Sequence, residues 1–210
     1  MPSQQQRSTD HFASQFTDGI AYRAQFDADF SLDDASKRKL QQTFAQTSDK
    51  AMEEPFFSIR QRLCSLAQTY ASDNSVKRFN YQCLADSHTF LKTCLEQNIV
   101  QKNYMTLTVG DVAYKGSRLF NTSHHSIAQA ISHSISTVDT PTFHVWLTLA
   151  DLTVIDLTVI NQLIAMGQIE SCDDRDQWAN IWRHERKGNF DYIPILSDDD
   201  FFSRLQRKSN

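Results

Sequence analysis

The sequence predicts an α+β domain, and three observations favour this class. Apolar residues recur at helical spacing in the N-terminal half, alternating apolar runs fill much of the C-terminal half, and short helical segments separate the later strands. The chain has 210 residues, 40% of them hydrophobic, which is enough for one substantial core. We expect a flexible or partly ordered arm over residues 1–30 and a single domain with an N-terminal helical extension over residues 31–210.

Three helices are predicted before the first strand. In "SLDDASKRKLQQTFAQ", Ser31 is the expected N-cap, with acidic residues in the first turn and basic residues later. In "EEPFFSIRQRLCSLAQTYAS", apolar residues recur at helical spacing. After the loop "SDNSVKRFNYQ", the third helix covers "CLADSHTFLKTCLEQN", which places Cys83 at its start.

The remaining chain is expected to alternate between strands and short helices. "NYMTLTV" is strand-like and is expected to end at Gly110 and Asp111, and a short helix is expected near residues 124–135. "FHVWLTLADLTVIDLTV", residues 143–159, predicts a hairpin. "NQLIAMGQ" and "DDRDQWANIWRHE" are predicted as short helices, "FDYIPIL" as the last strand, and "SDDDFFSRLQRK" as a terminal helix capped by Ser197.

The apolar, β-branched hairpin contains one histidine, His144, and two aspartates, of which Asp156 lies within the second strand. A hairpin loop with an odd number of residues puts His144 and Asp156 on the same face, and a loop at residues 149–151 would place them directly opposite each other. Directly opposed Cβ atoms lie about 4.5–5.5 Å apart, which suits an imidazole–carboxylate hydrogen bond. The pair is therefore predicted to interact, either as a structural contact or as part of a site.

Composition narrows the classes of partner. The net charge of −4 and the pI near 5.9 give no attraction for phosphates, so nucleic acid is not an expected partner. Asp151 and Asp156 interrupt the longest apolar region, which argues against a membrane span. Without a secretory signal or a CxxC pair, the four cysteines are interpreted as reduced thiols of a cytoplasmic protein. No metal or other cofactor is expected, because His124, His125 and His133 lack Cys or Glu residues at ligand spacing.

Cys83 is the candidate nucleophile. Backbone N–H groups and the helix dipole at the start of a helix favour the thiolate form of a cysteine. A nucleophilic cysteine also needs a base, and a third group that orients this base. The chain offers Cys83, His144 and Asp156 for these three roles, in that order.

The sequence segments around these residues resemble the transglutaminase-like branch of the papain-like cysteine superfamily. The resemblance covers about residues 78–160 and is carried by "CLADSHTFLKTCLEQNI", by "HVW" at His144 and by "IDLT" at Asp156, with the strand "YMTLTVGDV" between them. It implies a papain-like domain in which a central cysteine helix packs on an antiparallel sheet. It also implies a Cys-His-Asp triad, for which Gln82, Asn80 and the backbone N–H of Cys83 are oxyanion-hole candidates.

The function expected from this resemblance is cysteine-dependent acyl transfer through a thioester. Amide or peptide hydrolysis, deamidation and transamidation share the first half of this chemistry, so the acyl acceptor stays open. The substrate would be a peptide, a protein or a small amide or ester, and the oligomeric state stays open. The alternative is a catalytically silent transglutaminase-like module that binds a protein or peptide.

Overall fold

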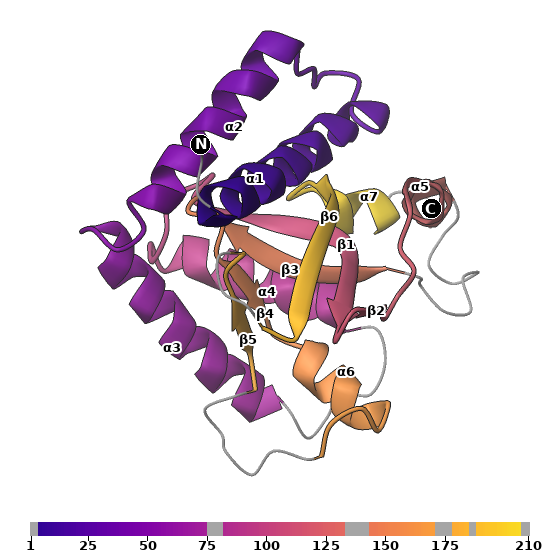
Figure 1. Ribbon diagram of the computed structural model, residues 1–210. Coiled ribbons are helices and arrows are strands. Elements are labelled where there is room, and N and C mark those ends of the chain that lie inside the picture. The colour runs from indigo at the N-terminus through magenta and orange to yellow at the C-terminus, as the bar shows by residue number, and fades with distance from the viewer. Residues whose placement is uncertain (1–3, 75–81, 133–142, 171–177, 185–187, 207–210) are drawn as a thin grey trace.

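The computed structural model describes residues 4–74, 82–132, 143–170, 178–184 and 188–206 (Figure 1). Its elements form one antiparallel sheet surrounded by helices. In chain order they are α1 (Gln4–Tyr22), η1 (Arg23–Gln25), α2 (Asp34–Asp49), α3 (Phe56–Asn74), α4 (Cys83–Glu96), β1 (Met105–Tyr114), β2 (Ser117–Arg118), α5 (His124–Ser132), β3 (His144–Leu149), β4 (Val154–Asp156), α6 (Val159–Ala165), β5 (Asn180–Trp182), β6 (Phe190–Ser197) and α7 (Phe201–Gln206). The α+β class is therefore confirmed.

Strand β1 is the centre of the sheet. It pairs with β3 along one edge and with β6 along the other, and the strand order is β2-β1-β3-β4-β5 with β6 attached to β1. The pairings between these strands are antiparallel, as predicted. This arrangement brings the start of β3, the end of β4 and the middle of β6 into one region of the domain.

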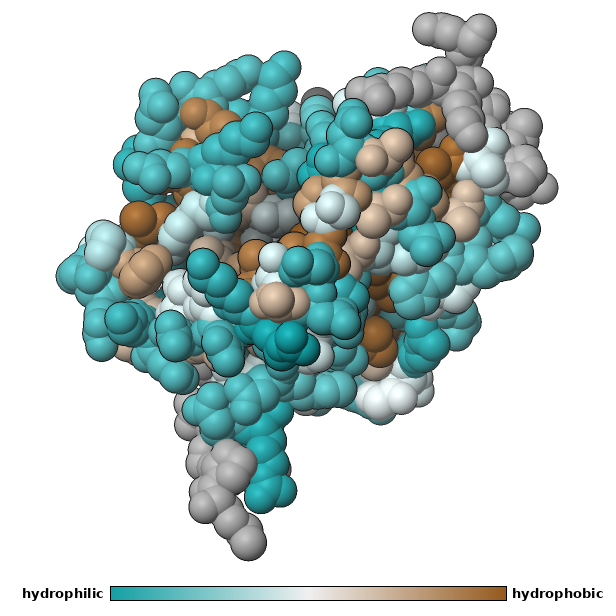
Figure 2. All heavy atoms as spheres, turned by 90° about the horizontal axis from the view of Figure 1, so that it is seen from above, coloured by the Kyte–Doolittle hydropathy of each residue, from teal (hydrophilic) through white to brown (hydrophobic). Residues whose placement is uncertain are grey.

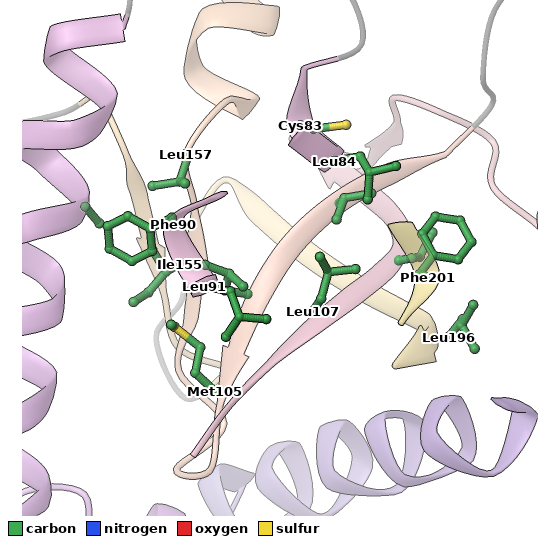
Figure 3. Close-up of a cluster of buried hydrophobic side chains, with 14 of the residues drawn as sticks. Cys83, Leu84, Phe90, Leu91, Met105, Leu107, Ile155, Leu157, Leu196 and Phe201 are labelled. Atoms are coloured by element: carbon green, nitrogen blue, oxygen red, sulfur yellow. The ribbon is translucent and has the colours of Figure 1, made fainter. Parts of the chain in front are cut away.

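The sheet is covered by helices on both sides (Figure 1). Helix α4 packs against β1 and β3, and its apolar side chains join a large buried cluster shown in Figure 3. Helix α1 packs against β6 on the other side, where Phe12 and Phe16 join a second cluster with Trp146 and Tyr192. Burial of such aromatic and aliphatic surface stabilises the fold by about 25 cal/mol per Å² removed from water.

The helices predicted over residues 53–72, 83–98 and 124–135 are confirmed, within the described residues, as α3 (Phe56–Asn74), α4 (Cys83–Glu96) and α5 (His124–Ser132). The N-terminal segment is more ordered than the arm expected over residues 1–30, since α1 occupies most of it. Phe12 and Phe16 are spaced four residues apart, so they share one face of α1, and both are buried. The many Gln and Ser residues of this segment made the helical spacing of its apolar residues difficult to recognise in the sequence.

Two predicted caps are wrong by a short distance. Asp33, rather than Ser31, is the N-cap of α2, because its carboxylate accepts the N–H of Ser36 at 2.7 Å. Ser197 is the last residue of β6 and not a cap; ahead of α7, Asp198 accepts the N–H of Asp200.

Two predicted boundaries also need correction. Strand β1 does not end at Gly110 but continues to Tyr114. The segment "DDRDQWANIWRHE" was predicted as a helix, but Asn180–Trp182 forms β5, because pairing with β4 outweighs its local helical pattern. The first part of that segment lies outside the described residues.

Gly110 is required where β1 bends between its two neighbours. The register with β6 shifts between Val109 and Gly110, and Gly110 lies opposite His144 on β3. A Cβ atom at this position would come within 2.1 Å of the carbonyl oxygen of Ile193 and 2.6 Å of the Trp146 ring. Glycine therefore permits the close approach of β6 and Trp146 beside the start of β3.

The face shown in Figure 2 is largely hydrophilic, with hydrophobic residues visible between the polar ones. Met52 and Met166 are the exposed large hydrophobic residues of the described part of the chain. In the same ranges, we find no helix whose length and apolar character would let it cross a membrane.

Candidate functional site

His144 and Asp156 are hydrogen-bonded, as the sequence predicted, but through a different register. The hairpin turns at residues 150–152, and the pairs Leu147–Ile155 and Thr148–Val154 fix its alignment. The loop still contains an odd number of residues, so the two polar side chains share a face. The expected direct opposition is wrong: the register is offset by two residues, and His144 Nε2 reaches diagonally to Asp156 Oδ2 at 2.7 Å.

Asp156 lies at the end of β4, completely buried, and accepts four hydrogen bonds. Its Oδ2 accepts from His144 Nε2 and from the hydroxyl of Tyr192 at 3.0 Å. Its Oδ1 accepts the backbone N–H groups of Thr158 and Val159, each at 3.0 Å, at the start of α6. Four donors and no nearby acceptor favour an ionised carboxylate, because each of these bonds is stronger to a charged oxygen.

Tyr192 on β6 holds the carboxylate from a third strand. Its hydroxyl accepts a hydrogen bond from Asn180 Nδ2 at 2.8 Å, which leaves its own proton for Asp156. Burial, followed by the negative charge of Asp156, raises the pKa of Tyr192 well above its ordinary value. The hydroxyl therefore stays protonated and acts as a fixed donor.

The bond to Asp156 sets the tautomer of His144. An ionised carboxylate only accepts, so the proton of the neutral imidazole must reside on Nε2, and Nδ1 must carry the lone pair. Nδ1 is buried and makes no hydrogen bond among the described residues. Nδ1 is therefore the ring nitrogen that a base at this position would use.

Cys83 is the first residue of α4 and 4% exposed. Figure 3 shows its side chain at the end of the helix, at the edge of the apolar cluster that contains Leu91 and Leu107. The thiol lies close enough to the His144 ring to raise the pKa of the imidazole, although it does not form a well-aligned hydrogen bond to Nδ1. The structure thus brings together all three residues that the sequence singled out.

The electrostatics of His144 favour its protonated form. Burial lowers the pKa of the imidazole, but the charge of Asp156, the hydrogen bond to it and the neighbouring Cys83 outweigh this effect. The net result is a pKa raised to about 10. In general, a protonated imidazole beside a cysteine favours the thiolate form.

Aromatic rings enclose the imidazole. Phe120 stacks on His144 with ring centroids 4.5 Å apart and an interplanar angle of 6°. Trp146 lies two residues further along β3, with its ring centroid 6.2 Å from that of His144, and its Nε1 donates to Thr148 Oγ1. These contacts exclude water from the ring and restrict its rotation.

Two of the three oxyanion-hole candidates lie within the described residues. Gln82 is the exposed N-cap of α4, and its side chain makes no capping hydrogen bond. Asn80 lies outside the described residues. The backbone N–H of Cys83, at the first position of α4, has no carbonyl partner within its own helix, as is general for the first turn. Of the candidates, it stays the one that is best placed.

The other cysteines differ from Cys83 in their surroundings. Cys94 is buried, and burial raises the pKa of its thiol to about 11. Burial also raises the pKa of Cys64. Cys172 lies outside the described residues. Both described thiols are therefore held in the less reactive protonated form.

The sequence did not identify Tyr192, Asn180 or Phe120 as parts of this site. Each lies in or beside a strand: Asn180 is paired with Asp156 across β4 and β5, Tyr192 lies on β6, and Phe120 follows β2. Only the pairing of strands from distant parts of the chain brings them to His144 or Asp156. Within the described ranges, no group of three or more His, Cys, Asp or Glu side chains is arranged to hold a metal ion.

Comparison with known proteins adds no relative. No protein-family model, no curated protein and no solved structure matches this chain.

Proposed function

We propose that this chain is a cysteine-dependent acyl-transfer enzyme that works through a thioester on Cys83. Its class would be that of the papain-like fold with a transglutaminase-like arrangement, in which a cysteine helix packs on an antiparallel sheet. The observation that carries the proposal is the state of His144. Its Nε2 is fixed by Asp156, whereas its Nδ1 is buried, unpaired and adjacent to the Cys83 thiol.

In the first half-reaction the Cys83 sulfur, as thiolate, attacks a carbonyl carbon, and the carbonyl π electrons move onto oxygen. The backbone N–H of Cys83 would stabilise this oxyanion. When the intermediate collapses, the carbon–nitrogen or carbon–oxygen bond breaks. The leaving amine or alcohol takes the proton from Nδ1 of the His144 imidazolium, and a thioester remains on Cys83.

In the second half-reaction an acceptor attacks the thioester. His144 Nδ1 removes the proton of a water molecule or an amine as the new bond to carbon forms. The carbon–sulfur bond then breaks, which restores the thiolate and the imidazolium. Throughout, Asp156 stays ionised and holds the ring, because four donors keep its carboxylate in one orientation.

Hydrolysis of a peptide or isopeptide bond is the version that we favour, since it needs only water as the second substrate. Deamidation and transamidation use the same first half-reaction. The substrate would be a peptide, a protein or a small amide or ester. No nucleic acid is proposed as a partner, in keeping with the net charge of −4.

One observation favours the alternative of a catalytically silent binding module. The Cys83 side chain is 4% exposed, so in this conformation little of it meets solvent. A silent module would retain the fold and the His144–Asp156 pair while its thiol reacted slowly and without help from the histidine. The two proposals therefore differ in the chemistry of a single sulfur atom.

A thiol-reactive probe on the intact protein separates them. At pH 6 an ordinary thiol with a pKa near ~8.5 is almost fully protonated, so fast labelling requires an activated thiolate. We expect iodoacetamide to label Cys83 selectively at pH 6, and this labelling to be lost in His144→Ala. Slow labelling that is independent of His144 would favour the silent module.

His184→Ala is a matched control for that variant. His184 is also a buried histidine and its Nε2 also pairs with an oxygen, Oγ1 of Thr9, but it packs on Phe12 of α1 instead of the site. It should lose a comparable amount of packing and leave the labelling rate unchanged. A similar loss of labelling in both variants would point to general destabilisation.

A further inference from the structure

The loop after β2 carries Phe120, the ring that covers His144. Phe120 is only half-buried and could adopt many orientations on a free loop, yet it lies nearly parallel to the imidazole, with an interplanar angle of 6°. Something must therefore hold its backbone. The hydrogen bonds of the described residues identify one buried side chain that does so.

That side chain is Asp111, on β1, which is completely buried. Its Oδ1 accepts the N–H of Phe120 at 3.1 Å and that of Val112 at 2.8 Å. Its Oδ2 accepts the N–H of Thr122 at 3.1 Å and the Nε–H of Arg118. Two of these four donors, Phe120 and Thr122, belong to the loop, and a third, Arg118, is the last residue of β2. One carboxylate therefore fixes the chain on both sides of Phe120.

A second contact ties the same loop to the strand beside His144. The hydroxyl of Thr122 donates to the carbonyl oxygen of Gly110 at 2.7 Å, and Gly110 is paired with His144 across the β1–β3 ladder. Arg118 closes the loop from outside by donating to the carbonyl oxygen of Thr122 at 2.7 Å. The loop is thus anchored to the position that faces the histidine.

We propose that Asp111 is a positioning residue for the imidazole of His144, acting through the loop that presses Phe120 against its ring. The stacked ring excludes water and contributes an attractive cation–π interaction when the imidazole is protonated. Asp111 itself does not touch the reacting atoms. It sets the proton affinity and orientation of the base that Cys83 uses, and in this respect the inference rests on the proposed function.

Other groups also act on the protonation of His144. Asp156 on β4 raises its pKa by charge and by a hydrogen bond, Cys83 on α4 raises it further, and burial lowers it. Tyr192 on β6 contacts Asp156 and not the imidazole. Phe120 adds a neutral contact to this set, so its removal should lower the pKa without changing the number of charges around the ring.

The test compares Phe120→Leu, Asp111→Asn and a control, Asp151→Asn, in the full chain. Asp151 is likewise completely buried and accepts both an arginine and a local backbone N–H, but it lies at the opposite end of the hairpin. NMR titration of the His144 ring carbons reports the proton affinity directly. Amide hydrogen exchange at Phe120 and Thr122 reports whether the loop is held.

We expect Phe120→Leu to lower the pKa of His144 by about one unit, a tenfold change in proton affinity. Asp111→Asn should shift the pKa in the same direction and accelerate exchange at both loop amides, because an amide side chain cannot accept from all four donors. Asp151→Asn should leave the pKa of His144 unchanged, although it destabilises the fold. Faster loop exchange in Asp111→Asn with an unaltered His144 pKa would overturn the inference and make Asp111 a purely structural residue.

The titration needs no turnover, so it separates the two proposals. If Cys83 is unreactive but the His144 pKa follows Asp111 and Phe120, the positioning role stands and the proposed enzyme fails. If Cys83 reacts rapidly at pH 6 in Asp111→Asn as in the unsubstituted chain and the pKa is unmoved, the enzyme stands and the positioning role fails. Phe120→Leu guards against a misfolded Asp111 variant, since it leaves every hydrogen bond of Asp111 in place.

Discussion

The β3–β4 hairpin carries a buried aspartate near each of its ends, and the two differ in their partners. Near the turn, Asp151 Oδ2 contacts Arg60 at 2.8 Å and Arg183 at 3.4 Å. At the other end, Asp156 contacts His144 at 2.7 Å and Tyr192 at 3.0 Å. Both carboxylates also accept local backbone N–H groups, from Thr153 at Asp151 and from Thr158 and Val159 at Asp156.

The comparison shows that the partner of a buried carboxylate decides whether the pair can take part in proton transfer. A guanidinium keeps its proton at any physiological pH, so an Asp–Arg pair can brace helix α3 against the sheet but cannot transfer a proton. An imidazole can gain and lose a proton, and that of His144 leaves one nitrogen unused beside a thiol. We therefore expect changes at Asp151 to affect stability and changes at Asp156 to affect reactivity.

The largest expected effect is that of Asp156→Asn on the acylation of Cys83. The amide can donate to the ring, which would favour the tautomer with its lone pair on Nε2 and leave no base at Nδ1. By analogy with other triads, the rate of acylation by an activated ester should fall on the order of 10³–10⁴-fold. A loss of less than about tenfold, measured by mass spectrometry over time, would reduce Asp156 to a structural partner.

Asp151→Asn should have its main effect on stability. Removal of one partner from a buried ion pair destabilises a protein by about 3–5 kcal/mol, because the remaining charge stays buried. Here the change takes the carboxylate away from Arg60, whose side chain is 10% exposed. Urea unfolding should show this loss, while the labelling of Cys83 in the folded protein stays as fast as before. Loss of Cys83 labelling in folded Asp151→Asn would contradict the distinction between a stabilising role for Asp151 and a role in reactivity for Asp156.

The pH dependence of stability should also distinguish the ends. The pKa of folded His144 is raised to about 10, above its unfolded value. A raised pKa contributes stability that is complete below the unfolded value of about 6.5 and disappears as the pH rises toward the folded value. The stability difference between the unsubstituted chain and His144→Gln should therefore shrink between about pH 6.5 and 10. A difference that grows over this range would contradict the ion-pair account.

Tyr192→Phe, which changes one partner of Asp156, is expected to have the smallest effect of these variants. It removes one of the four donors to Asp156 and should cost about 1 kcal/mol of stability. The carboxylate becomes a better acceptor for the imidazolium, so the pKa of His144 should rise further and not fall. NMR titration gives the sign, and a lowered pKa would show that the hydroxyl acts on the ring by another route.

Local sequence signals predicted the site where the chain itself sets the geometry. Alternation along residues 143–159 placed His144 and Asp156 on one face, and the start of a helical pattern placed Cys83 at a helix terminus. The register was wrong by two residues, because the turn position depends on packing around Leu152, which adopts a positive φ and is fully buried. The loop still contains an odd number of residues, so His144 and Asp156 share a face and form the predicted hydrogen bond.

Local sequence patterns did not predict the contacts between segments that are far apart in the chain. Tyr192 is 36 residues from Asp156 in sequence, and Arg60 is 91 residues from Asp151. Their partners are set by the strand order and by the packing of α3, which no local pattern reveals. Asp111 shows the same limit, since "GD" was interpreted as the end of a strand, whereas the strand continues and its aspartate anchors a loop.

The most direct test of the central claim is the site and histidine dependence of acylation by an activated ester. The intact protein would be treated with p-nitrophenyl acetate, quenched, digested under acidic conditions and examined by mass spectrometry. We predict a rapid, stoichiometric acetyl thioester on Cys83 that does not form in His144→Ala but forms normally in His184→Ala. Acetylation that is equally fast in His144→Ala, or that falls on Cys64 and Cys94 instead of Cys83, would contradict the account.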